Sequence, residues 1–316
     1  MQVLSQSEID KLPSWVKAEM ATARVVGESG SSIELADGRK YLINNPINEL
    51  SGSEWTKFLC SVINTHYPTN GVEGYAHKIR KLHPTPKPPQ LMRDLIKFFT
   101  KSDDIVLDYF MGVGGSLLGA SLCDRKAVGI DLNPLYVETY KKASAELNLQ
   151  EQITAIGDCA TILADAVKMN ELLGGKQAGM ILIDPPYANM MAKEKTGADI
   201  EIYGKNATPF SDSPFDLGNM PYDKFLTTFK SIVASSLPHL KKKGYVVVFC
   251  KDMQPKKKTT NLLHAAIIQS LNEIDGFYYR GLKIWADQSS KLFPYGYPFD
   301  FVANQIHQYI LIFRKY

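Results

Sequence analysis

Short apolar runs alternate with helical patterns from Pro89 to the end of the 316-residue chain, and this alternation limits the possible folds more than any other feature. The apolar runs have few polar interruptions, which is typical of strands buried on both faces of a parallel sheet. Parallel strands need long crossovers, so we expect helices on both faces. We predict strands at 105–108, 127–131, 152–157, 180–184 and 244–250, and helices at 89–100, 115–123, 134–147, 160–173, 222–237 and 261–273. Two strand-like runs, 277–285 and 307–314, complete an α/β, doubly wound, mostly parallel sheet with an antiparallel C-terminal hairpin.

The first four predicted strands all end in or next to an aspartate, which core packing alone does not require. The carboxyl ends of neighbouring parallel strands meet at one edge of a sheet, and ligands of such sheets bind there. We therefore expect a ligand site at this edge. The four residues are Asp108, Asp131, Asp158 and Asp184.

The tetrapeptide Asp184-Pro185-Pro186-Tyr187 follows the fourth predicted strand. Two consecutive prolines fix φ and remove two N–H donors, so the carbonyl groups there have little freedom. A carboxylate and a fixed carbonyl can accept both hydrogens of a planar amino group, and Tyr187 could stack on the heterocycle that carries it. A nucleobase amine has this chemistry. The alternative is a plain turn in which Asp184 caps the backbone and Tyr187 lies on the core.

A glycine-rich loop, residues 108–116, joins the first predicted strand to a helix. Its glycines allow close approach of a ligand, although tight packing of strand and helix also favours glycine. The spacing is not that of a phosphate-binding loop. Asp131, at the end of the next strand, is suitably placed for ribose hydroxyls, and Asn133 is the better cap for the helix that begins at Pro134. The loop and Asp131 together predict a nucleoside ligand that has no pyrophosphate.

Three separated motifs resemble those of the S-adenosylmethionine-dependent amino-methyltransferases that modify DNA at adenine N6 or cytosine N4. They are His83-Pro84-Thr85-Pro86-Lys87-Pro88, Asp108-Tyr109-Phe110-Met111-Gly112-Val113-Gly114 and Asp184-Pro185-Pro186-Tyr187. The closing run 308–315 is also similar to the last strand of that family, so the resemblance covers roughly residues 80–315. It implies a Rossmann-like methyltransferase sheet and S-adenosylmethionine as cofactor.

The resemblance also implies roles for single residues. Asp108 and Gly112 would contact the methionine portion of the cofactor, and Phe110 would border it. Lys87 would lie near the methionine carboxylate; the alternative is a solvated lysine between prolines. The complete implied cofactor set is Thr85, Lys87, Asp108, Phe110, Gly112, Gly114, Asp131, Asp158 and Cys159.

At the other end of the cofactor, the resemblance assigns the ribose hydroxyls to Asp131. It assigns the adenine amine to Asp158 or to the backbone of Cys159. The reaction needs no metal, and His66, His77 and His83 lack the spacing of metal ligands.

The resemblance makes Asp184, Pro185, Pro186 and Tyr187 the catalytic residues. An exocyclic amine is a poor nucleophile, and positive charge develops on its nitrogen during attack on the sulfonium methyl group. Asp184 and the Pro185 carbonyl would stabilise that charge. A base inside a duplex cannot reach such a pocket, so the base would be flipped out and stacked on Tyr187. Asp in the tetrapeptide favours adenine, because many cytosine enzymes have Ser there.

The order of the motifs differs from the order that is common in the family. The His-Pro-Thr segment usually follows the tetrapeptide, and here it precedes it. Such changes are circular permutations of one sheet, so the chemistry is retained. The positions of the target-reading region and of any oligomer interface are less defined by the resemblance. Tyr109 also stands where proline is common.

Outside these motifs, two lysine-bearing segments are candidates for nucleic-acid contacts. We interpret 188–220 as a lid or target-contacting insertion, with Lys193 and Lys195 among its residues. Lys256, Lys257 and Lys258 follow the fifth strand on the ligand side, where they could contact phosphates. By contrast, 241–243 is interpreted as a solvated helix end. The aromatic run 293–301 either stacks on bases or packs on itself.

We divide the chain into an N-terminal extension, 1–75, and a catalytic domain, 76–316. The pair Asp37-Gly38 predicts a β-hairpin in the extension, and 46–88 looks irregular. The net charge is only +3, and the four cysteines are scattered without a CxxC pair, so neither a zinc site nor a disulfide framework is indicated. Without an apolar leader or a run of membrane-spanning length, we expect a soluble cytoplasmic protein.

The leading hypothesis is a DNA methyltransferase, with adenine N6 as target, in DNA modification or restriction-modification. The alternatives are a cytosine-N4 enzyme, an RNA (tRNA) guanine-N2 methyltransferase, and an inactive subunit that keeps the fold for nucleic-acid binding. Duplex DNA with a flipped base is the expected partner. The chain has little room for a separate recognition domain, so we also consider a homodimer or a partner subunit.

Overall fold

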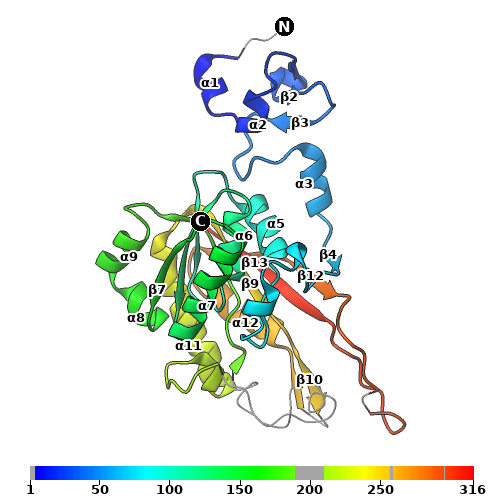
Figure 1. The fold of residues 1–316 in the computed structure, drawn as a ribbon, viewed down its shortest axis with the longest axis vertical. Helices are drawn as coiled ribbons and strands as arrows, with labels where there is room; N and C mark the ends of the chain where they lie inside the picture. Colours follow the sequence, from blue (N-terminus) through cyan, green and yellow to red (C-terminus); the bar gives the residue numbers. More distant parts are fainter. Residues whose placement is uncertain (1–3, 189–209, 257–258, 295) are drawn as a thin grey trace.

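The computed structural model describes residues 4–188, 210–256, 259–294 and 296–316, and an eight-stranded sheet forms its centre (Figure 1). The strand order is β4-β12-β13-β9-β8-β5-β6-β7, where β13 is antiparallel to both neighbours and the other pairs are parallel. The doubly wound, mostly parallel sheet with an antiparallel C-terminal hairpin is thus confirmed. The strands are β4 Val62–Thr65, β5 Ile105–Asp108, β6 Lys126–Asp131, β7 Ile153–Ile156, β8 Ala178–Ile183, β9 Leu240–Cys250, β12 Phe277–Asp287 and β13 His307–Lys315.

Helices cover both faces of this sheet. Successive side chains of a strand point to opposite faces, so an apolar strand needs an apolar cover on each side. In β5, Ile105 and Leu107 join one apolar cluster, and Val106 joins the other. The first cluster includes residues of α8 Cys159–Ala164, α9 Ala166–Leu172, α11 Tyr222–Ser236 and α12 Leu263–Asn272. The second includes residues of α5 Pro89–Phe99, α6 Gly115–Ser121 and α7 Pro134–Glu146. The predicted helices are therefore present, and Asn133 caps α7 as expected, accepting from the Leu135 amide at 3.0 Å.

Two details differ from the prediction. The helix expected over 160–173 is divided at Asp165, which has an extended backbone and accepts hydrogen bonds from the amides that open α9. The lysines 241–243 are not a helix end, because α11 ends at Ser236 and β9 already begins at Leu240. A 3-10 turn, Leu237–His239, contains the proline that separates the two elements.

A small unit precedes the sheet. Helix α1 Gln6–Asp10 begins this unit. Strands β1 Arg24–Val26, β2 Ser32–Glu34 and β3 Lys40–Leu42 form an antiparallel sheet that packs with α2 Ser14–Lys17. The predicted hairpin at Asp37-Gly38 is confirmed, with Gly38 at a positive φ of 84°. The boundary at residue 75 remains a prediction.

The segment that looked irregular contains regular elements. They are α3 Gly52–Phe58, β4, a 3-10 turn at Val72–Gly74 and α4 His77–Arg80. Strand β4 pairs in parallel with β12, so a strand from before residue 75 forms an edge of the central sheet. Each of these elements is short and lies in a segment rich in proline and glycine, so the sequence shows no clear helix or strand pattern there.

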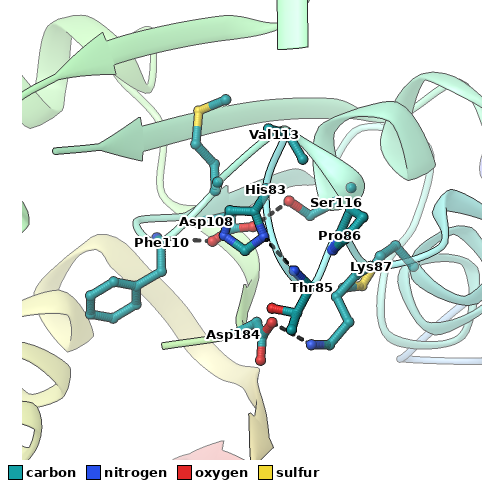
Figure 2. Close-up of a pocket in the computed structure, with 13 residues that line it drawn as sticks. His83, Thr85, Pro86, Lys87, Asp108, Phe110, Val113, Ser116 and Asp184 are labelled. Atoms are coloured by element: carbon teal, nitrogen blue, oxygen red, sulfur yellow. Dashed lines mark hydrogen bonds and ion pairs between the residues drawn. The ribbon is translucent and has the colours of Figure 1, made fainter. Parts of the chain in front are cut away.

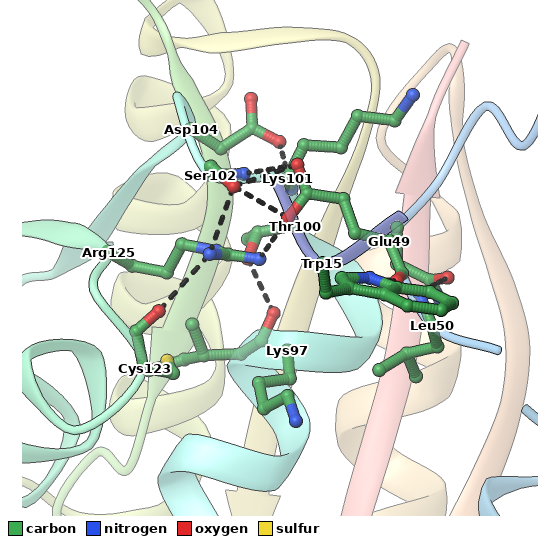
Figure 3. Close-up of polar contacts among 12 residues, drawn as sticks. Trp15, Glu49, Leu50, Lys97, Thr100, Lys101, Ser102, Asp104, Cys123 and Arg125 are labelled. Atoms are coloured by element: carbon green, nitrogen blue, oxygen red, sulfur yellow. Dashed lines mark hydrogen bonds and ion pairs between the residues drawn. The ribbon is translucent and has the colours of Figure 1, made fainter. Parts of the chain in front are cut away.

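Polar contacts through Glu49 attach the small unit to the central sheet (Figure 3). The Arg125 guanidinium pairs with the Glu49 carboxylate at 2.9 Å and also donates to Thr100 Oγ1 and to the Cys123 carbonyl. The Trp15 indole, from α2, donates to the Glu49 carbonyl at 2.8 Å. Glu49 thus receives hydrogen bonds both from the small unit and from the central sheet.

Among the described residues, no helix combines the length and the apolar character that crossing a bilayer requires.

Replacing Arg125 should loosen this attachment. In Arg125→Met the half-buried Glu49 keeps its charge without a partner, so we expect the free energy of unfolding to fall by about 2 kcal/mol. Urea denaturation followed by tryptophan fluorescence measures the change. The neighbouring exposed residue supplies the control, Lys126→Met, which should unfold like the unmodified chain. Equal stability of the two variants would contradict the role of Arg125.

Candidate active site

A pocket lies at the carboxyl edge of the sheet, beside the ends of β5 and β8 (Figure 2). Segment 83–87 and the loop 108–116 supply most of its wall, and Met92 and Asp184 complete it. The pocket therefore lies at the edge where the acid-ended strands predict a ligand site. Of the nine residues implied for the cofactor, those that line the pocket are Thr85, Lys87, Asp108, Phe110 and Gly112.

The glycine loop packs tightly against its surroundings. A Cβ atom on Gly114, which has a positive φ of 74°, would lie 2.1 Å from the Tyr140 ring, and one on Gly115 would lie 2.8 Å from the Lys87 carbonyl. Both positions therefore need glycine. Gly114 faces Tyr140 rather than the pocket, so its glycine serves packing, whereas Gly115 brings the loop against segment 83–87.

Asp108 ends β5 and is almost fully buried in the pocket wall. Its carboxylate accepts hydrogen bonds from the Phe110 amide at 3.0 Å and from the Ser116 hydroxyl. Burial raises the pKa of Asp108 to about 7. Both partners are uncharged, so within the described part of the chain no ion pair neutralises this carboxylate. A cationic group in the pocket would do so.

Asp131 ends the neighbouring strand β6. It accepts from the Gly112 amide at 2.7 Å and from the Asn133 amide at 2.8 Å, so it holds the glycine loop in place. Burial raises its pKa to about 6. Its assignment to ribose hydroxyls remains a prediction.

Asp158 and Cys159 lie outside the pocket lining. Asp158 caps α8 by accepting from the amide and the hydroxyl of Thr161. Cys159 is buried, and burial raises the pKa of its thiol far above the usual range. Their contact with an adenine amine remains a prediction.

Arg80 supports segment 83–87 from behind. Its side chain is 1% exposed, and one guanidinium nitrogen donates to the Lys87 carbonyl at 2.8 Å. Its Nε atom is buried and has no hydrogen-bond partner among the residues that the structure describes, and burial lowers the pKa of Arg80 to about 10. The sequence gives no signal for this residue, because a single arginine ahead of the motif has no distinguishing pattern.

His83 links the pocket to the segment that precedes α11. Its ring stacks on Phe210 with centroids 5.2 Å apart, and its Nδ1 accepts from the Thr85 amide at 3.2 Å. Exclusion of water lowers the pKa of His83 to about 4, so its ring is neutral near pH 7. Phe210 belongs to the predicted insertion 188–220, so the described end of that insertion, 210–220, contacts a residue of the pocket wall. Lys193 and Lys195 lie outside the described residues.

An ion pair joins the two halves of the site. Lys87 Nζ contacts a carboxylate oxygen of Asp184, and the side chains are only 7% and 17% exposed (Figure 2). The ammonium group also lies 5.3 Å from the centre of the Phe249 ring. The alternative of a solvated Lys87 is therefore wrong.

Tyr187 completes this arrangement. Its hydroxyl donates to the other carboxylate oxygen of Asp184 at 2.6 Å, and its ring packs on the apolar core. Burial, followed by the charge of Asp184, raises the pKa of Tyr187 well above the usual range, so the hydroxyl stays a donor. The plain-turn alternative is thus half right: Tyr187 does lie on the core, but the hydrogen bonds that Asp184 accepts within the described chain come from the side chains of Lys87 and Tyr187, not from the backbone. Pro185 is buried and Pro186 half-buried in the turn between Asp184 and Tyr187.

The predicted phosphate-binding lysines are only partly described. Lys256 lies in β10 Met253–Lys256, which pairs with β11 Thr259–Asn261 just beyond the end of β9, and Lys257 and Lys258 lie outside the described residues. The described residues contain no group of three or more His, Cys, Asp or Glu side chains that could hold a metal ion.

A family model described as DNA methylase, of the N6/N4 type, matches residues 35–142, which contain both loops of the pocket wall. Among curated proteins, the type II methyltransferase M.HpaI of Haemophilus parainfluenzae is 36% identical over 95 residues, which are 29% of this chain and 30% of that protein. M1.MboII of Moraxella bovis is 32% identical over 120 residues, 36% and 43% of the two chains. A tRNA (guanine(10)-N2)-dimethyltransferase of Pyrococcus abyssi is 30% identical over 155 residues, 49% of this chain and 40% of that protein. The chain thus spans less than half the length of these relatives.

Among solved structures, TrmN from Thermus thermophilus aligns with a TM-score of 0.47 and 14% identity over 77% of this chain and 53% of that chain. The match of the family model contains the first two of the three motifs, 83–88 and 108–114, whereas the tetrapeptide at 184–187 lies outside it. Over these matched segments the chain is similar to DNA methyltransferases of the N6/N4 amino-methyltransferase type.

Proposed function

We propose that this protein transfers a methyl group from S-adenosylmethionine to an exocyclic amine of a DNA base, with adenine N6 as target. The observation that carries the proposal is the position of Asp184. It lies at the end of β8, in the wall of the pocket that Asp108 and the glycine loop form, with Lys87 and Tyr187 on its two oxygens.

The residues of the pocket fit this cofactor. The carboxylate of Asp108 lacks an ion pair within the described chain and would receive the cationic amino group of the methionine portion. Lys87 lies at the same pocket, and the buried cation of Arg80 stands behind its segment, so a carboxylate there is favoured. Gly112 leaves room for close approach. When bound, S-adenosylmethionine supplies an electrophilic methyl group on a sulfonium and departs as the neutral thioether.

Asp184 orients the amine and stabilises the charge that forms on it. A carboxylate has about four lone-pair sites, so Asp184 can accept one amine N–H while it keeps its bonds from Lys87 and Tyr187. The Pro185 carbonyl accepts the second N–H. As the nitrogen–carbon bond forms and the sulfur–carbon bond breaks, the nitrogen becomes cationic. It then loses one proton through Asp184 to solvent, which restores the neutral amine.

The choice of DNA is supported by the family model and the type II relatives. The choice of adenine is supported by the Asp that begins the tetrapeptide. Cytosine N4 is the alternative within the same family. A base in a duplex must leave the stack to reach Asp184, and we propose that Tyr187, whose hydroxyl is already fixed on Asp184, borders it there.

A second candidate, methylation of guanine N2 in tRNA, is favoured by one observation. The P. abyssi relative, named for that activity, matches 155 residues, a longer stretch than either type II relative above. Guanine N2 is also an exocyclic amine, so the same acceptors would serve.

Transfer of a labelled methyl group to unmethylated genomic DNA and to unmethylated tRNA tests the function. We expect label in DNA, recovered as N6-methyladenine after digestion to nucleosides. Asp184→Ala should lower transfer by at least about 100-fold, because it removes a preorganised acceptor, while calorimetry should show unchanged cofactor affinity. The exposed Asp103 provides the control, Asp103→Ala, with normal activity. Label in tRNA alone would support the second candidate, and loss of cofactor binding in Asp184→Ala would refute the assigned role.

Lys87→Met tests the ion pair separately. Methionine keeps the length of the side chain but removes the charge that holds Asp184, so we expect kcat to fall by about 10- to 100-fold. Steady-state kinetics and cofactor titration measure both effects, with Lys81→Met, at an exposed lysine, as control. A weaker cofactor affinity with unchanged kcat would mean that Lys87 serves only the cofactor.

Cofactor affinity should depend on pH through Asp108. Its pKa of about 7 means that this carboxyl takes up a proton as the pH falls, and only the ionised form pairs with an ammonium group. We therefore expect affinity to fall from about pH 8 to about pH 5, with proton release on binding near neutral pH. Calorimetry in two buffers of different ionisation enthalpy detects the released proton. Asp108→Asn should abolish the release, and a pH-independent affinity of the unmodified chain would contradict this assignment.

A further inference from the structure

The connection between β12 and β13, residues 288–306, forms a projecting arm (Figure 1). Two hydrogen bonds tie its flanks together: the Phe293 amide donates to Asn304 Oδ1 at 2.8 Å, and Asn304 Nδ2 donates to the Phe293 carbonyl at 2.7 Å. At its tip, the Phe299 amide donates to the Gly296 carbonyl. These hydrogen bonds hold together the described parts of the arm, 288–294 and 296–306.

Several large apolar side chains of the arm face solvent. Leu292 is 72% exposed, Tyr297 79%, Phe299 92% and Phe301 88%. The alternative of a self-packed aromatic loop is therefore wrong. Several large apolar side chains gathered at one exposed place usually mark a surface that contacts another molecule.

The arm projects from the edge of the sheet that carries the pocket. In the pairing of β13 with β9, Tyr309 lies opposite Cys250, the last residue of β9. In the pairing of β9 with β8, Val248 lies opposite Ile183, directly before Asp184. The β10–β11 hairpin projects in the same direction as the arm in Figure 1. A molecule that presents a base to Asp184 therefore approaches the edge from which the arm extends.

The segment that follows β9 is basic in sequence, which suits a polyanion. The sequence 251–258, which follows β9, has four lysines and one aspartate, whereas the arm has only Lys291 and Asp300. Uncharged aromatic side chains next to a basic segment form the combination that binds stacked bases and phosphates. A purely apolar partner surface would not account for the lysines.

We propose that the tip of the arm, Tyr297, Phe299 and Phe301, contacts the bases of a nucleic-acid duplex whose target base enters the pocket. This inference rests on the proposed function and extends it to duplex recognition. A base that leaves the stack gives up its contacts with its neighbours, and apolar side chains inserted between base steps replace them. The arm supplies such side chains from the edge where the base is extruded.

The double variant Phe299→Ala/Phe301→Ala tests the arm. Its matched control is Tyr278→Ala/Tyr316→Ala, which removes two exposed aromatic rings at the opposite end of the same β12–β13 pair. Fluorescence anisotropy measures binding to a DNA duplex and to one of its strands, and labelled-methyl transfer is measured on the same DNA. Cofactor calorimetry and sedimentation accompany each variant, so that loss of folding or association is seen.

We expect the arm variant to bind the duplex at least about tenfold more weakly, with unchanged cofactor affinity and a smaller loss on the single strand. The control should bind like the unmodified chain. Equal duplex affinity of all three proteins would overturn the proposal. So would self-association of the unmodified chain that the arm variant alone abolishes, because the arm would then join two copies. Should no nucleic acid be methylated by any of them, the proposed function fails, and duplex binding still decides the role of the arm.

Discussion

The ion pair between Lys87 and Asp184 joins segments 97 residues apart, and the rest of the site depends on it. Lys87 comes from a loop that α4 and Arg80 hold against the first turn of α6. Asp184 ends a strand buried between β5 and β9. A buried ammonium group requires a carboxylate, and this pairing orients Asp184 in the pocket wall before any substrate is present. The same contact therefore fixes one wall of the pocket and orients its reactive group.

The pocket wall and the residues that support it contain more buried ionisable groups than folding alone would favour. Burial raises the pKa values of Asp108 and Asp131 and lowers those of Arg80 and His83. Each shift is a free-energy cost of keeping a group in the charged form away from water. The methionine portion of the cofactor is zwitterionic: its ammonium group would offset the cost of the buried carboxylates, and its carboxylate would offset the cost of the buried guanidinium. The pattern of charge thus argues for this cofactor independently of the sequence motifs.

The sheet, its helices and the pocket loops could be predicted from the sequence, because apolar strands and the residues at their ends follow local rules. The engagement of Lys87 with Asp184 could not, since nothing local distinguishes a paired lysine from a solvated one. Arg80 was missed for the same reason. The strand at Val62–Thr65 was hidden because its pairing with β12 is a long-range contact. The Lys241–Lys243 segment was misjudged because lysines at a sheet margin resemble those at a helix end.

Strand order explains why the permuted motif order leaves the site intact. The sheet places β8, β5 and β6 side by side, so the acids at their ends, Asp184, Asp108 and Asp131, are neighbours at one edge. Asp158 follows the edge strand β7, one position beyond β6, and neither Asp131 nor Asp158 is among the residues that line the pocket. Whether segment 83–87 comes before or after the tetrapeptide in the chain does not alter these neighbours. The connection between β12 and β13 leaves the sheet at this same edge and forms the arm, so the arm and the three acids share one edge of the sheet.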